Sequence, residues 1–526
     1  MQKVYADGLN LQQKIMEGVN KLADNVAATL GPKGRNVILH KKGTNPVITK
    51  DGVTVANFVD LQDPFEQAGA QLLKQAASRT NALAGDGTTT STVLARDILR
   101  NSQKYLIAGA TPVEMKKGMD KAVRKIVEKI EQLAKPVNSI QDIEHVATVS
   151  ANGDKSIGSL IAAAVDKAGH DGSILVEGAK SIETSLDLVE GFRFDSGYFA
   201  QAFVTNERKN TVEYEDALFF VTDYKIDNVK SVLPVLELAA REAKPLIIVA
   251  EQVEGQALAA LIMNSVRGSM KVAAIKAPGY GHERVNIMKD LCLATGATFF
   301  NRVSGREIEK IKLVDFGICK KIEVLKSSTT IMGGSADWEA IDKKIDSLKS
   351  EIQQTEDIEE CRKLQERITR LSSGVAVIKV GATTEVEMIE KKHRVDDALE
   401  AVNSAQQCGI VPGGGITLLG CRDFEIDAEN EDQQIGATVI RKSLEAPIRQ
   451  MAHNAGISAD LIIDKVENEV EKNIGWDFKN SQMVDMVLSG IIDPAKVVSV
   501  AIQNAVSVSS TLVTTNNAIV ELTNES

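Results

Sequence analysis

Residues 245–277 read PLIIVAEQVEGQALAALIMNSVRGSMKVAAIKA, and this stretch predicts the fold of the middle of the chain. Its two short apolar runs, Leu246–Ala250 and Lys271–Ala277, have the length and composition of buried strands, and the segment between them is apolar at helical spacing. A helix over Val285–Thr295 and a third strand at 297–300 continue the alternation. Strands that alternate with helices predict a parallel sheet flanked by helices, so we expect an α/β domain here.

The segments on either side of this middle part are mostly helical. From Leu9 to Leu133 apolar residues recur at helical spacing, and Pro136 ends this part. After Gly374 the chain continues through VAVIKVG into a long helix and then becomes alanine-rich and helical. We therefore expect a multidomain α and α/β fold, in which a mainly helical domain formed by both termini carries the α/β domain as an insertion.

Residues Trp338–Leu371 have the pattern of a charged helical pair. Each arm carries one apolar stripe, and a break at Gln354–Asp357 predicts an antiparallel hairpin. Because each arm is short, packing on the middle domain is favoured over a coiled-coil oligomerisation device.

Length, charge and cysteine usage exclude several classes of protein. The 526 residues suffice for about three domains, and 61 Lys and Arg against 72 Asp and Glu give a net charge of −11. We expect no affinity for nucleic acid or for an anionic membrane. The five cysteines lack CxxC spacing, which argues against a disulfide framework or a zinc site. With no targeting run in MQKVYADGLN and no membrane-length apolar stretch, we expect a bacterial or host cytoplasmic protein, with an organellar matrix as the alternative.

The segment AGDGTTTSTVLARDIL (84–99) has the composition of a phosphate-binding loop. Backbone N–H groups and the hydroxyls of its threonine run would meet where a helix begins and its dipole is positive. Asp86 could supply a carboxylate to a Mg²⁺ ion shared with phosphate oxygens. A flexible loop followed by a threonine N-cap explains the same residues equally well.

Three further loops have the turn residues for close backbone approach to a ligand: TLGPKGRNV (29–37), ITKDGVTVA (48–56) and IVPGGGITLL (410–419). Each has a structural alternative, respectively a plain turn, a hairpin turn and relief of crowding between helices. The sequence contains no P-loop, no complete dinucleotide fingerprint and no HExxH or GxSxG motif. These absences disfavour a P-loop ATPase and zinc-dependent or serine hydrolases.

Eight segments occur in the order and at the spacing of one protein family: LGPKGRNV, TKDGVTVA, AGDGTTT, KVAAIKAPGYG, GVAVIKVGA, RVDDALEAV, GIVPGGG and GIIDPAKV. From about Leu9 to Leu522 the chain resembles the group I (GroEL-type) chaperonins. The resemblance implies an equatorial ATP-binding domain (1–132 and 407–526), an intermediate hinge domain (133–189 and 375–406) and an apical client-binding domain (190–374).

The resemblance also implies which residues bind the nucleotide. ATP with Mg²⁺ would contact Thr29, Leu30, Gly31, Pro32, Lys50, Asp86, Gly87, Thr88, Thr89, Thr90, Gly414, Asp477, Phe478, Lys479 and Asp493. Asp86 would hold the metal, and K⁺ is a further candidate cation. Asp397 would activate the attacking water and Asp51 would help to position it. Without the resemblance, a surface ion pair on a helix is the favoured interpretation of Asp397.

In the apical domain the resemblance implies an apolar rim that captures unfolded chains. The matching residues are Tyr198, Phe199, Phe203, Leu233, Leu236, Leu258, Ile262 and Met263. From helical spacing alone, Leu258, Ile262 and Met263 read as a buried core stripe. The functional interpretation requires these side chains to stay exposed.

The sequence departs from the family at four places. Ala200–Ala202 stand where relatives have Ser-Pro-Tyr, which leaves binding of a co-chaperonin lid open. Phe478 and Lys479 replace two alanines at the adenine site, so ATP affinity is expected to differ. Ser458 replaces an acidic residue at the ring-to-ring contact while Arg449 is kept, so we expect weaker ring stacking. The chain ends without a Gly-Gly-Met tail, and we expect a cavity floor lacking that apolar segment.

We therefore expect an ATP-dependent chaperonin. Seven-membered rings, single or double, would capture non-native polypeptides and fold them inside a cavity, driven by ATP binding and hydrolysis. The alternative is a ring-forming holdase or scaffold with weak or lost ATPase activity. Retention of Asp51, Asp86 and Asp397 favours the ATPase.

Overall fold

The structure is a computed structural model that describes residues 2–41, 43, 46–168, 173–179, 181–335, 338–355, 357–372 and 374–522. The chain divides into two compact units. Unit 1 comprises Met1–Ala163, Gly178–Thr184 and Val380–Ser526, and unit 2 comprises Ala164–Glu177 and Ser185–Lys379. Unit 1 thus combines both ends of the chain, and unit 2 is inserted in its sequence. The expected multidomain α and α/β fold is confirmed, and the finer division into three domains stays a prediction.

The helical part of the chain begins with α1 and resumes after unit 2. Its helices are α1 (Gly8–Ala27), α2 (Gly52–Phe58), α3 (Pro64–Ala84), α4 (Thr88–Ile107), α5 (Pro112–Leu133), α6 (Ile140–Ser150), α7 (Lys155–Ala168), α13 (Glu385–Cys408), α14 (Ile416–Gly420), α15 (Glu431–Ser443), α16 (Ala446–Ala455), α17 (Ala459–Glu467) and α18 (Ala495–Val513). As expected, α5 ends just before Pro136.

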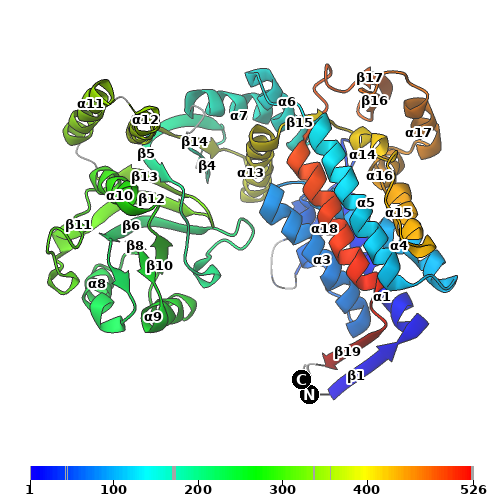
Figure 1. Cartoon of the computed structure of the whole chain (residues 1–526), viewed down its shortest axis with the longest axis horizontal. Coiled ribbons are helices and arrows are strands. Elements are labelled where there is room, and N and C mark those ends of the chain that lie inside the picture. The colour runs from blue at the N-terminus through cyan, green and yellow to red at the C-terminus, as the bar shows by residue number, and fades with distance from the viewer. Residues whose placement is uncertain are drawn as a thin grey trace. The chain divides into compact units, whose positions relative to one another are not determined.

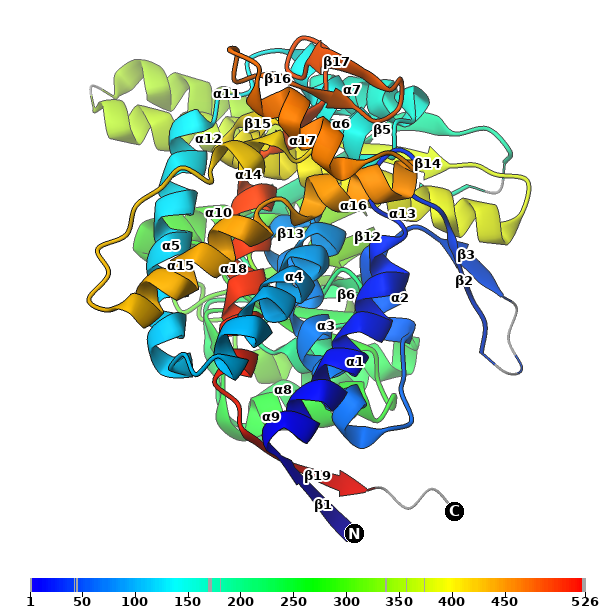
Figure 2. The same cartoon turned by 90° about the vertical axis from the view of Figure 1, so that its right-hand side faces the viewer.

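Among its described residues, unit 1 also contains four antiparallel strand pairs. They are β1 (Gln2–Asp7) with β19 (Asn517–Leu522), β2 (Val37–Leu39) with β3 (Val47–Thr49), β15 (Ile410–Pro412) with β18 (Ile492–Pro494), and β16 (Ile474–Asp477) with β17 (Gln482–Asp485). The first pair joins the two ends of the chain, as Figure 1 shows. Figure 2 shows the β2–β3 hairpin extending beyond the helices.

The core of unit 1 is built mainly from alanine, valine, leucine and isoleucine. Helix α18 packs against α3, α4 and α5 in this core (Figure 1). By length and composition, α18 is the one helix in the described part of the chain that could cross a membrane, with a mean hydropathy of 1.2. The prediction that no apolar stretch reaches this length was wrong. In this structure α18 is mostly buried, because it lies in the core of unit 1.

Unit 2 is built around a nine-stranded sheet with the order β10-β8-β6-β12-β13-β5-β14-β4, in which β11 also pairs with β6. The strands are β4 (Ser173–Gly178), β5 (Ser185–Phe194), β6 (Val212–Thr222), β8 (Leu246–Ala250), β10 (Val272–Lys276), β11 (Phe299–Phe300), β12 (Gly317–Val324), β13 (Thr329–Gly334) and β14 (Gly374–Val380). A separate short pair joins β7 (Lys225–Ile226) and β9 (Gln252–Val253).

The predicted alternation of strand and helix is confirmed at residues 245–300. Strands β8 and β10 are parallel, with Leu246 opposite Val272, and α9 (Gly255–Val266) connects them. The parallel pairing predicted for these strands is confirmed, since β6 is also parallel to β8 and to β11. Other strand pairs of the sheet are antiparallel: β12 runs antiparallel to both β6 and β13, and β5 runs antiparallel to both β13 and β14. The sheet is therefore mixed.

The remaining helices of unit 2 are α8 (Val229–Glu242), α10 (Gly281–Thr295), α11 (Trp338–Gln354) and α12 (Ile358–Ser372), with 3₁₀ turns η1 (Gln201–Phe203), η2 (Ile308–Lys310) and η3 (Leu313–Asp315). The predicted hairpin is confirmed as α11 and α12. Ile341 and Leu348 of α11 and Ile368 and Leu371 of α12 are buried in the core of unit 2. This burial agrees with packing on the α/β unit.

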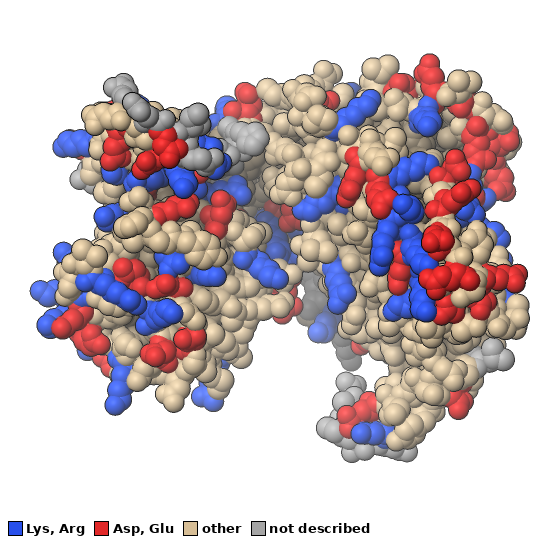
Figure 3. All heavy atoms as spheres, viewed as in Figure 1, with Lys and Arg blue, Asp and Glu red and all other residues tan. Residues whose placement is uncertain are grey.

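Charges of both signs are mixed on the face of unit 1 that Figure 3 shows, over α5 and α15. Three ion pairs belong to this region: Lys117 with Glu114, Lys121 with Glu429, and Lys125 with Glu128. Opposite charges that neutralise one another locally do not create the continuous positive field that draws nucleic acid to a surface.

Candidate functional site

The AGDGTTT segment forms a sharp turn between α3 and α4. Gly87 precedes the first turn of α4 with a φ of 83°, and a Cβ there would lie 2.7 Å from Cγ1 of Val497. A side chain at this position would therefore be strained and crowded. The turn leaves the first backbone N–H groups of α4, at Thr88, Thr89 and Thr90, without intrahelical acceptors. These N–H groups lie at the positive end of the helix dipole, where an anion is stabilised.

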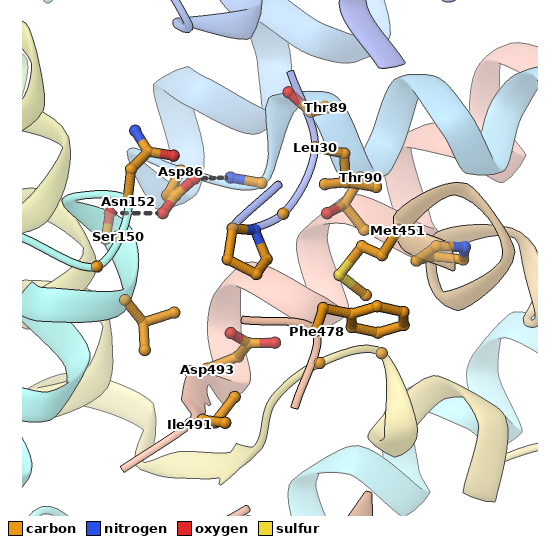
Figure 4. Close-up of a pocket in the computed structure, with 18 of the residues that line it drawn as sticks. Leu30, Asp86, Thr89, Thr90, Ser150, Asn152, Met451, Phe478, Ile491 and Asp493 are labelled. Carbon is orange, nitrogen blue, oxygen red and sulfur yellow. Dashed lines mark hydrogen bonds between the residues drawn. The ribbon is translucent and has the colours of Figure 1, made fainter. Parts of the chain in front are cut away.

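The Asp86 carboxylate is held in place by two donors from different elements. Ser150 Oγ at the end of α6 donates to Oδ2 at 2.7 Å, and the Gly87 N–H donates to Oδ1 at 2.5 Å (Figure 4). Burial raises the pKa of Asp86 above its usual range, and the negative charge of Asp51 adds to the rise. The structure thus fixes the orientation of this carboxylate through two uncharged donors.

A second carboxylate, Asp493, lies in the same site (Figure 4). Burial raises the pKa of Asp493 to about 7, and repulsion from Asp86 contributes. Two carboxylates with raised pKa values fit a cation between them, since a divalent ion would relieve both effects. No group of three or more His, Cys, Asp or Glu that could hold a metal occurs among the described residues. An ion here would take its other ligands from phosphate and water, as Mg²⁺ commonly does.

The ITKDGVTVA segment places its backbone against the threonine run. A Cβ on Gly52 would lie 2.6 Å from Thr89 Oγ1 and 2.7 Å from Thr88 Oγ1. Asp51 caps α2, accepting from the N–H groups of Val53 at 3.1 Å and Thr54 at 3.2 Å. The structural alternative of a hairpin turn at this position was wrong, because the segment passes from β3 directly into a capped helix.

The first glycine loop meets the same helix end. Thr29 Oγ1 lies 3.4 Å from Thr89 Oγ1, and Thr29 also donates to the carbonyl of Val26 at 2.8 Å. Lys50 lies nearby in the pocket wall, where burial and the positive charge of Arg394 lower its pKa. A lysine in such surroundings is a good partner for an added anion, which would compensate for its lost hydration.

All residues predicted for nucleotide binding and catalysis line one cavity of about 620 Å³ within unit 1. They are Thr29, Leu30, Gly31, Pro32, Lys50, Asp51, Asp86, Gly87, Thr88, Thr89, Thr90, Asp397, Gly414, Asp477, Phe478, Lys479 and Asp493. Segments from both ends of the chain therefore meet at one site. Their roles in binding and catalysis stay predictions.

One end of the cavity is polar and the other is apolar. Figure 4 shows Asp86 with Ser150 on one side, and Met451 next to Phe478 on the other. Phe478 is only 3% exposed and packs in a small core with Met451 and Ile448, against which Leu30 also packs. Phe478 thus contributes a large apolar side chain to the wall of the cavity.

Asp477 and Lys479 shape the turn beside Phe478. The Asp477 carboxylate accepts from the backbone N–H of Lys479 at 2.8 Å and from Asn480 Nδ2 at 2.7 Å. Lys479 is exposed. In this structure the Asp477 side chain stabilises the turn between β16 and β17.

Asp397 lies on α13 and faces the cavity from unit 1 itself. One turn earlier, Arg394 forms ion pairs with Asp154 at 3.2 Å and with Glu390 at 2.9 Å. The pair with Asp154 joins α13 to the segment just before α7, and the pair with Glu390 lies within α13. The helical turn that precedes Asp397 is thus held in place by the ion pairs of Arg394.

Sequence reasoning missed several residues that line the cavity, among them Ser150, Asn152, Lys155, Arg394 and Met451. Arg394 could have been found, since it begins the RVDDALEAV segment that contains Asp397. Ser150 and Met451 carried no local signal, because neither lies in a glycine-rich or charged motif.

The residues predicted for the apical rim differ in exposure. Leu233 is 45% exposed and Met263 is 46% exposed, whereas Tyr198, Phe199, Leu258 and Ile262 are partly buried. The expectation that all of these side chains are exposed was wrong for Phe203, which is 0% exposed, and for Leu236, which is 8% exposed. Both belong to the core of unit 2, because large apolar side chains on its inner faces are drawn into that core.

Arg449, expected to face a second ring, has partners within its own chain. It pairs with Glu445 at 2.6 Å and with Asp460 at 2.7 Å. Ser458 precedes α17 at the N-cap position, and its side chain makes no capping hydrogen bond. Two carboxylates of the same chain therefore already neutralise the Arg449 guanidinium.

Residues 22–523 match the TCP-1/cpn60 chaperonin family, so the chain belongs to this family. This match confirms the chaperonin resemblance at the level of the family.

Solved structures show the same fold. The chaperonin gp146 from the bacteriophage EL 2 (Pseudomonas aeruginosa), in the presence of ATP-BeFx, superimposes with a TM-score of 0.67 at 19% identity, covering 99% of this chain and 100% of that chain. A second crystal form of the same protein, also in the presence of ATP-BeFx, gives a TM-score of 0.63 at 18% identity and covers 99% of each chain. At these identities the likeness establishes the fold.

Proposed function

We propose that this chaperonin is an ATP-dependent folding machine of the GroEL type. The observation that carries the proposal is the single cavity in which every residue predicted for nucleotide binding and catalysis meets. Its polar end offers N–H groups and hydroxyls at the start of α4, and its apolar end offers Phe478 and Met451. A nucleotide has this same division into a charged phosphate chain and a flat apolar base.

The residues present would divide the binding among themselves. The first turn of α4 would bind phosphate oxygens, and Lys50 would add a positive charge. Asp86 and Asp493 would hold Mg²⁺, which when bound neutralises charge on the phosphates. Phe478 and Leu30 would exclude water around the base.

Hydrolysis would rest on the two remaining carboxylates. Asp397 would accept a proton from the attacking water, and Asp51, fixed by its helix cap, would orient that water. Phosphoryl transfer to water depends chiefly on positioning and charge neutralisation, so no covalent nucleophile is required.

Phosphate release with Mg·ATP tests this assignment. We expect wild-type release, and we expect Asp397→Asn to lower its rate by about 10²–10⁴-fold while ATP binding stays intact. The matched control is Asp427→Asn, which makes the same change at an exposed position outside the cavity. Absence of wild-type release would leave the ring-forming holdase, and unchanged release by Asp397→Asn would refute the role of Asp397.

Client capture would use the exposed apolar side chains of α8 and α9, which contact one another. Leu233 of α8 and Met263 of α9 are both about half exposed, and Val266 at the end of α9 is 67% exposed. Flexible apolar side chains on a surface bind many unfolded segments weakly.

Suppression of aggregation of a chemically denatured client tests this rim. We expect the double variant Leu233→Ser and Met263→Ser to lose most of this suppression, since both side chains are exposed and their replacement leaves the core intact. Val303→Ser, at a 96% exposed position of the same unit, is the control. Equal suppression by the double variant and the wild type would refute the rim.

The remaining expectations follow from the proposed type. Seven-membered rings in the cytoplasm, single or double, would enclose the client, and the Ala200–Ala202 segment leaves the need for a lid open.

A further inference from the structure

The loop Leu30–Pro32 lines the cavity, and one residue that supports it, Asn454 of α16, is not part of the cavity lining. Asn454 Nδ2 donates to the carbonyl of Leu30 at 2.9 Å and to the carbonyl of Ala27 at 2.9 Å. Ala27 is the last residue of α1, and its carbonyl also accepts from the backbone N–H of Leu30 at 3.1 Å. The side-chain amide of Asn454 therefore adds a second link between the end of α1 and the loop that lines the cavity.

The orientation of this amide is set by a chain of hydrogen bonds. Gln450, one turn earlier on α16, donates from Nε2 to Asn454 Oδ1 at 2.9 Å. Gln450 Oε1 in turn accepts from Arg96 Nη2 at 2.9 Å, and Arg96 Nη1 pairs with Asp24 Oδ1 at 2.7 Å. The chain thus runs from α1 through α4 and α16 to the loop.

Arginine determines the direction of the whole chain, because a guanidinium donates and never accepts. Gln450 must present its oxygen to Arg96 and therefore its NH₂ group to Asn454. Asn454 must then accept through its own oxygen, which aims its NH₂ group at the two carbonyls. Each amide has one arrangement that satisfies both neighbours.

The outer end of the chain is more exposed to solvent than the inner end. The side chain of Asp24 is 72% exposed and that of Arg96 is 19% exposed. All four members of the chain, including Gln450 and Asn454, line a second cavity of about 850 Å³ between α1, α4 and α16. A hydrogen bond to an exposed carboxylate contributes little, whereas a shielded bond that loses its partner is costly.

We propose that Asn454 is a positioning residue for the nucleotide, and that Arg96 sets its orientation through Gln450. The inference rests on the proposed function. Asn454 holds the Leu30–Pro32 loop in the shape that meets the nucleotide, although it does not line the cavity itself. Met451, on the same helix, supports the loop from its apolar side, since Leu30 packs against the core that contains Met451.

The variant Asn454→Asp tests this proposal with the least change in shape. It replaces an NH₂ donor with an oxygen facing two carbonyls, so the loop loses both bonds and gains repulsion. We expect the Kd of ATP to rise about tenfold, with a much smaller change in kcat for phosphate release. We also expect faster hydrogen exchange of the nucleotide-free chain at amides 29–35, where Leu30, Gly34 and Arg35 make the loop's backbone bonds.

Three further variants give the graded comparison. Gln450→Glu keeps the bond from Arg96 and removes the donor to Asn454, so an intermediate loss of affinity is expected. Asp24→Asn, at the exposed outer end, should change the Kd less than about twofold. The matched control is Asn25→Asp, because Asn25 is an exposed amide that donates to the carbonyl of Lys21 in the same helix at 2.7 Å.

The outcomes separate this inference from the proposed function. Faster exchange at amides 29–35 and weaker ATP binding in Asn454→Asp, both absent in Asn25→Asp, would support the positioning role. Unchanged loop exchange, or ATP binding as tight as in the wild type, would overturn it. A wild-type chain that binds no ATP would refute the proposed function and with it the role of Asn454 towards the nucleotide, while the exchange data would still report whether Asn454 supports the loop.

Discussion

Two carboxylates, Asp86 and Asp493, show how far the surroundings of a side chain can change its chemistry. Each would have an ordinary acidic pKa in water, and in the cavity burial raises both. The cause is the same for each: charged oxygens lose hydration, and each carboxylate is repelled by a neighbouring one. The site therefore holds negative charge at a cost in stability, and a bound cation would reduce this cost. The cost can be measured as a change in the free energy of unfolding with pH.

The first prediction concerns the stability of the chain without nucleotide or metal. The pKa of Asp493 is about 7 in the folded chain, against a model-compound value of 3.8, so the folded state holds this proton more tightly than the unfolded state. Its contribution to the free energy of unfolding is then greatest below pH 3.8 and is lost as the pH rises towards 7.

Thermal unfolding of the wild type and Asp493→Asn at about pH 5 and about pH 8 measures this contribution on either side of the shifted pKa. We expect the stability of the wild type relative to the variant to fall between the two pH values, and Mg²⁺ to restore more of it at the higher pH. Asp427→Asn, an exposed exchange of the same kind, serves as the control. A difference that does not change with pH would contradict the prediction.

Among the helices, close approach is set by glycines at the contact points. Helices α5 and α15 pack through Gly118 and Gly436, where a Cβ on Gly118 would lie 2.0 Å from the carbonyl oxygen of Gln433. Backbone on one helix thus lies where a side chain on the other would have to be. Such a contact cannot be relieved by rotating a side chain.

The second prediction is that Gly118→Ala destabilises unit 1 by about 1–3 kcal/mol, because α5 and α15 must move apart. Gly420→Ala is the matched control, since a Cβ on Gly420 meets no atom within 4 Å and the residue also lies in a helix. Urea unfolding, monitored by far-ultraviolet circular dichroism, compares the free energies of unfolding of the two variants. Equal stability of the two would show that the helices can adjust without cost.

In unit 2 a buried ion pair links the α11–α12 hairpin to α10. Arg367 of α12 donates from Nε and Nη2 to the two carboxylate oxygens of Asp290 in α10, at 2.7 and 2.8 Å. The two side chains are 8% and 3% exposed. A buried charge without its partner is much more costly than the intact pair is stabilising.

The third prediction follows from this asymmetry. Arg367→Met alone should destabilise the packing of α12 by about 3–5 kcal/mol, and the double variant with Asp290→Leu should recover most of that loss. Hydrogen exchange of α10 and α12 in the full chain measures the effect locally. Arg362→Met, at an exposed position of α12, is the control. A double variant no better than Arg367→Met would contradict the desolvation argument.

For the molecule as a whole, the proposed nucleotide site and the proposed capture surface belong to different units of one chain. The cavity lies within unit 1, and the exposed side chains Leu233 and Met263 lie in unit 2. A chain that changes its capture surface in response to ATP must therefore couple two compact bodies. Such coupling requires that ATP bind one arrangement of the chain more tightly than another.

The fourth prediction concerns assembly. Arg449 is already paired with Glu445 and Asp460 of its own chain, and Ser458 offers no charge to a second ring. We therefore expect sedimentation to show mainly a particle of seven 56.7 kDa chains and little of one with fourteen. The variant Ser458→Ala, in which Asp460 is unchanged, should have nearly the same distribution of particle sizes as the wild type. A stable particle of fourteen chains that survives high salt would contradict this expectation.

Much of the fold could be predicted because its signals are local. The run LIIVA and the helix after it follow from periodicity within a few residues, and the turn at Gly87 follows from neighbouring glycines and threonines. The mixed direction of the sheet could not be predicted in this way, because the antiparallel pairing of β12 with β6 joins segments about a hundred residues apart, whose order in the sheet no local pattern encodes.

The candidate site shows the same division. The amino-acid pattern was enough to single out the glycine loops, because each is a short segment with distinctive turn residues, whereas Asp397 was named only through the resemblance to the chaperonins. Folding in three dimensions was needed to bring them into one cavity and to bury Phe203 and Leu236. It was also needed to place Asn454 beside Leu30, which lies 424 residues away in the chain. Contacts of this kind depend on how segments distant in the sequence pack together, and a local sequence pattern does not specify that packing.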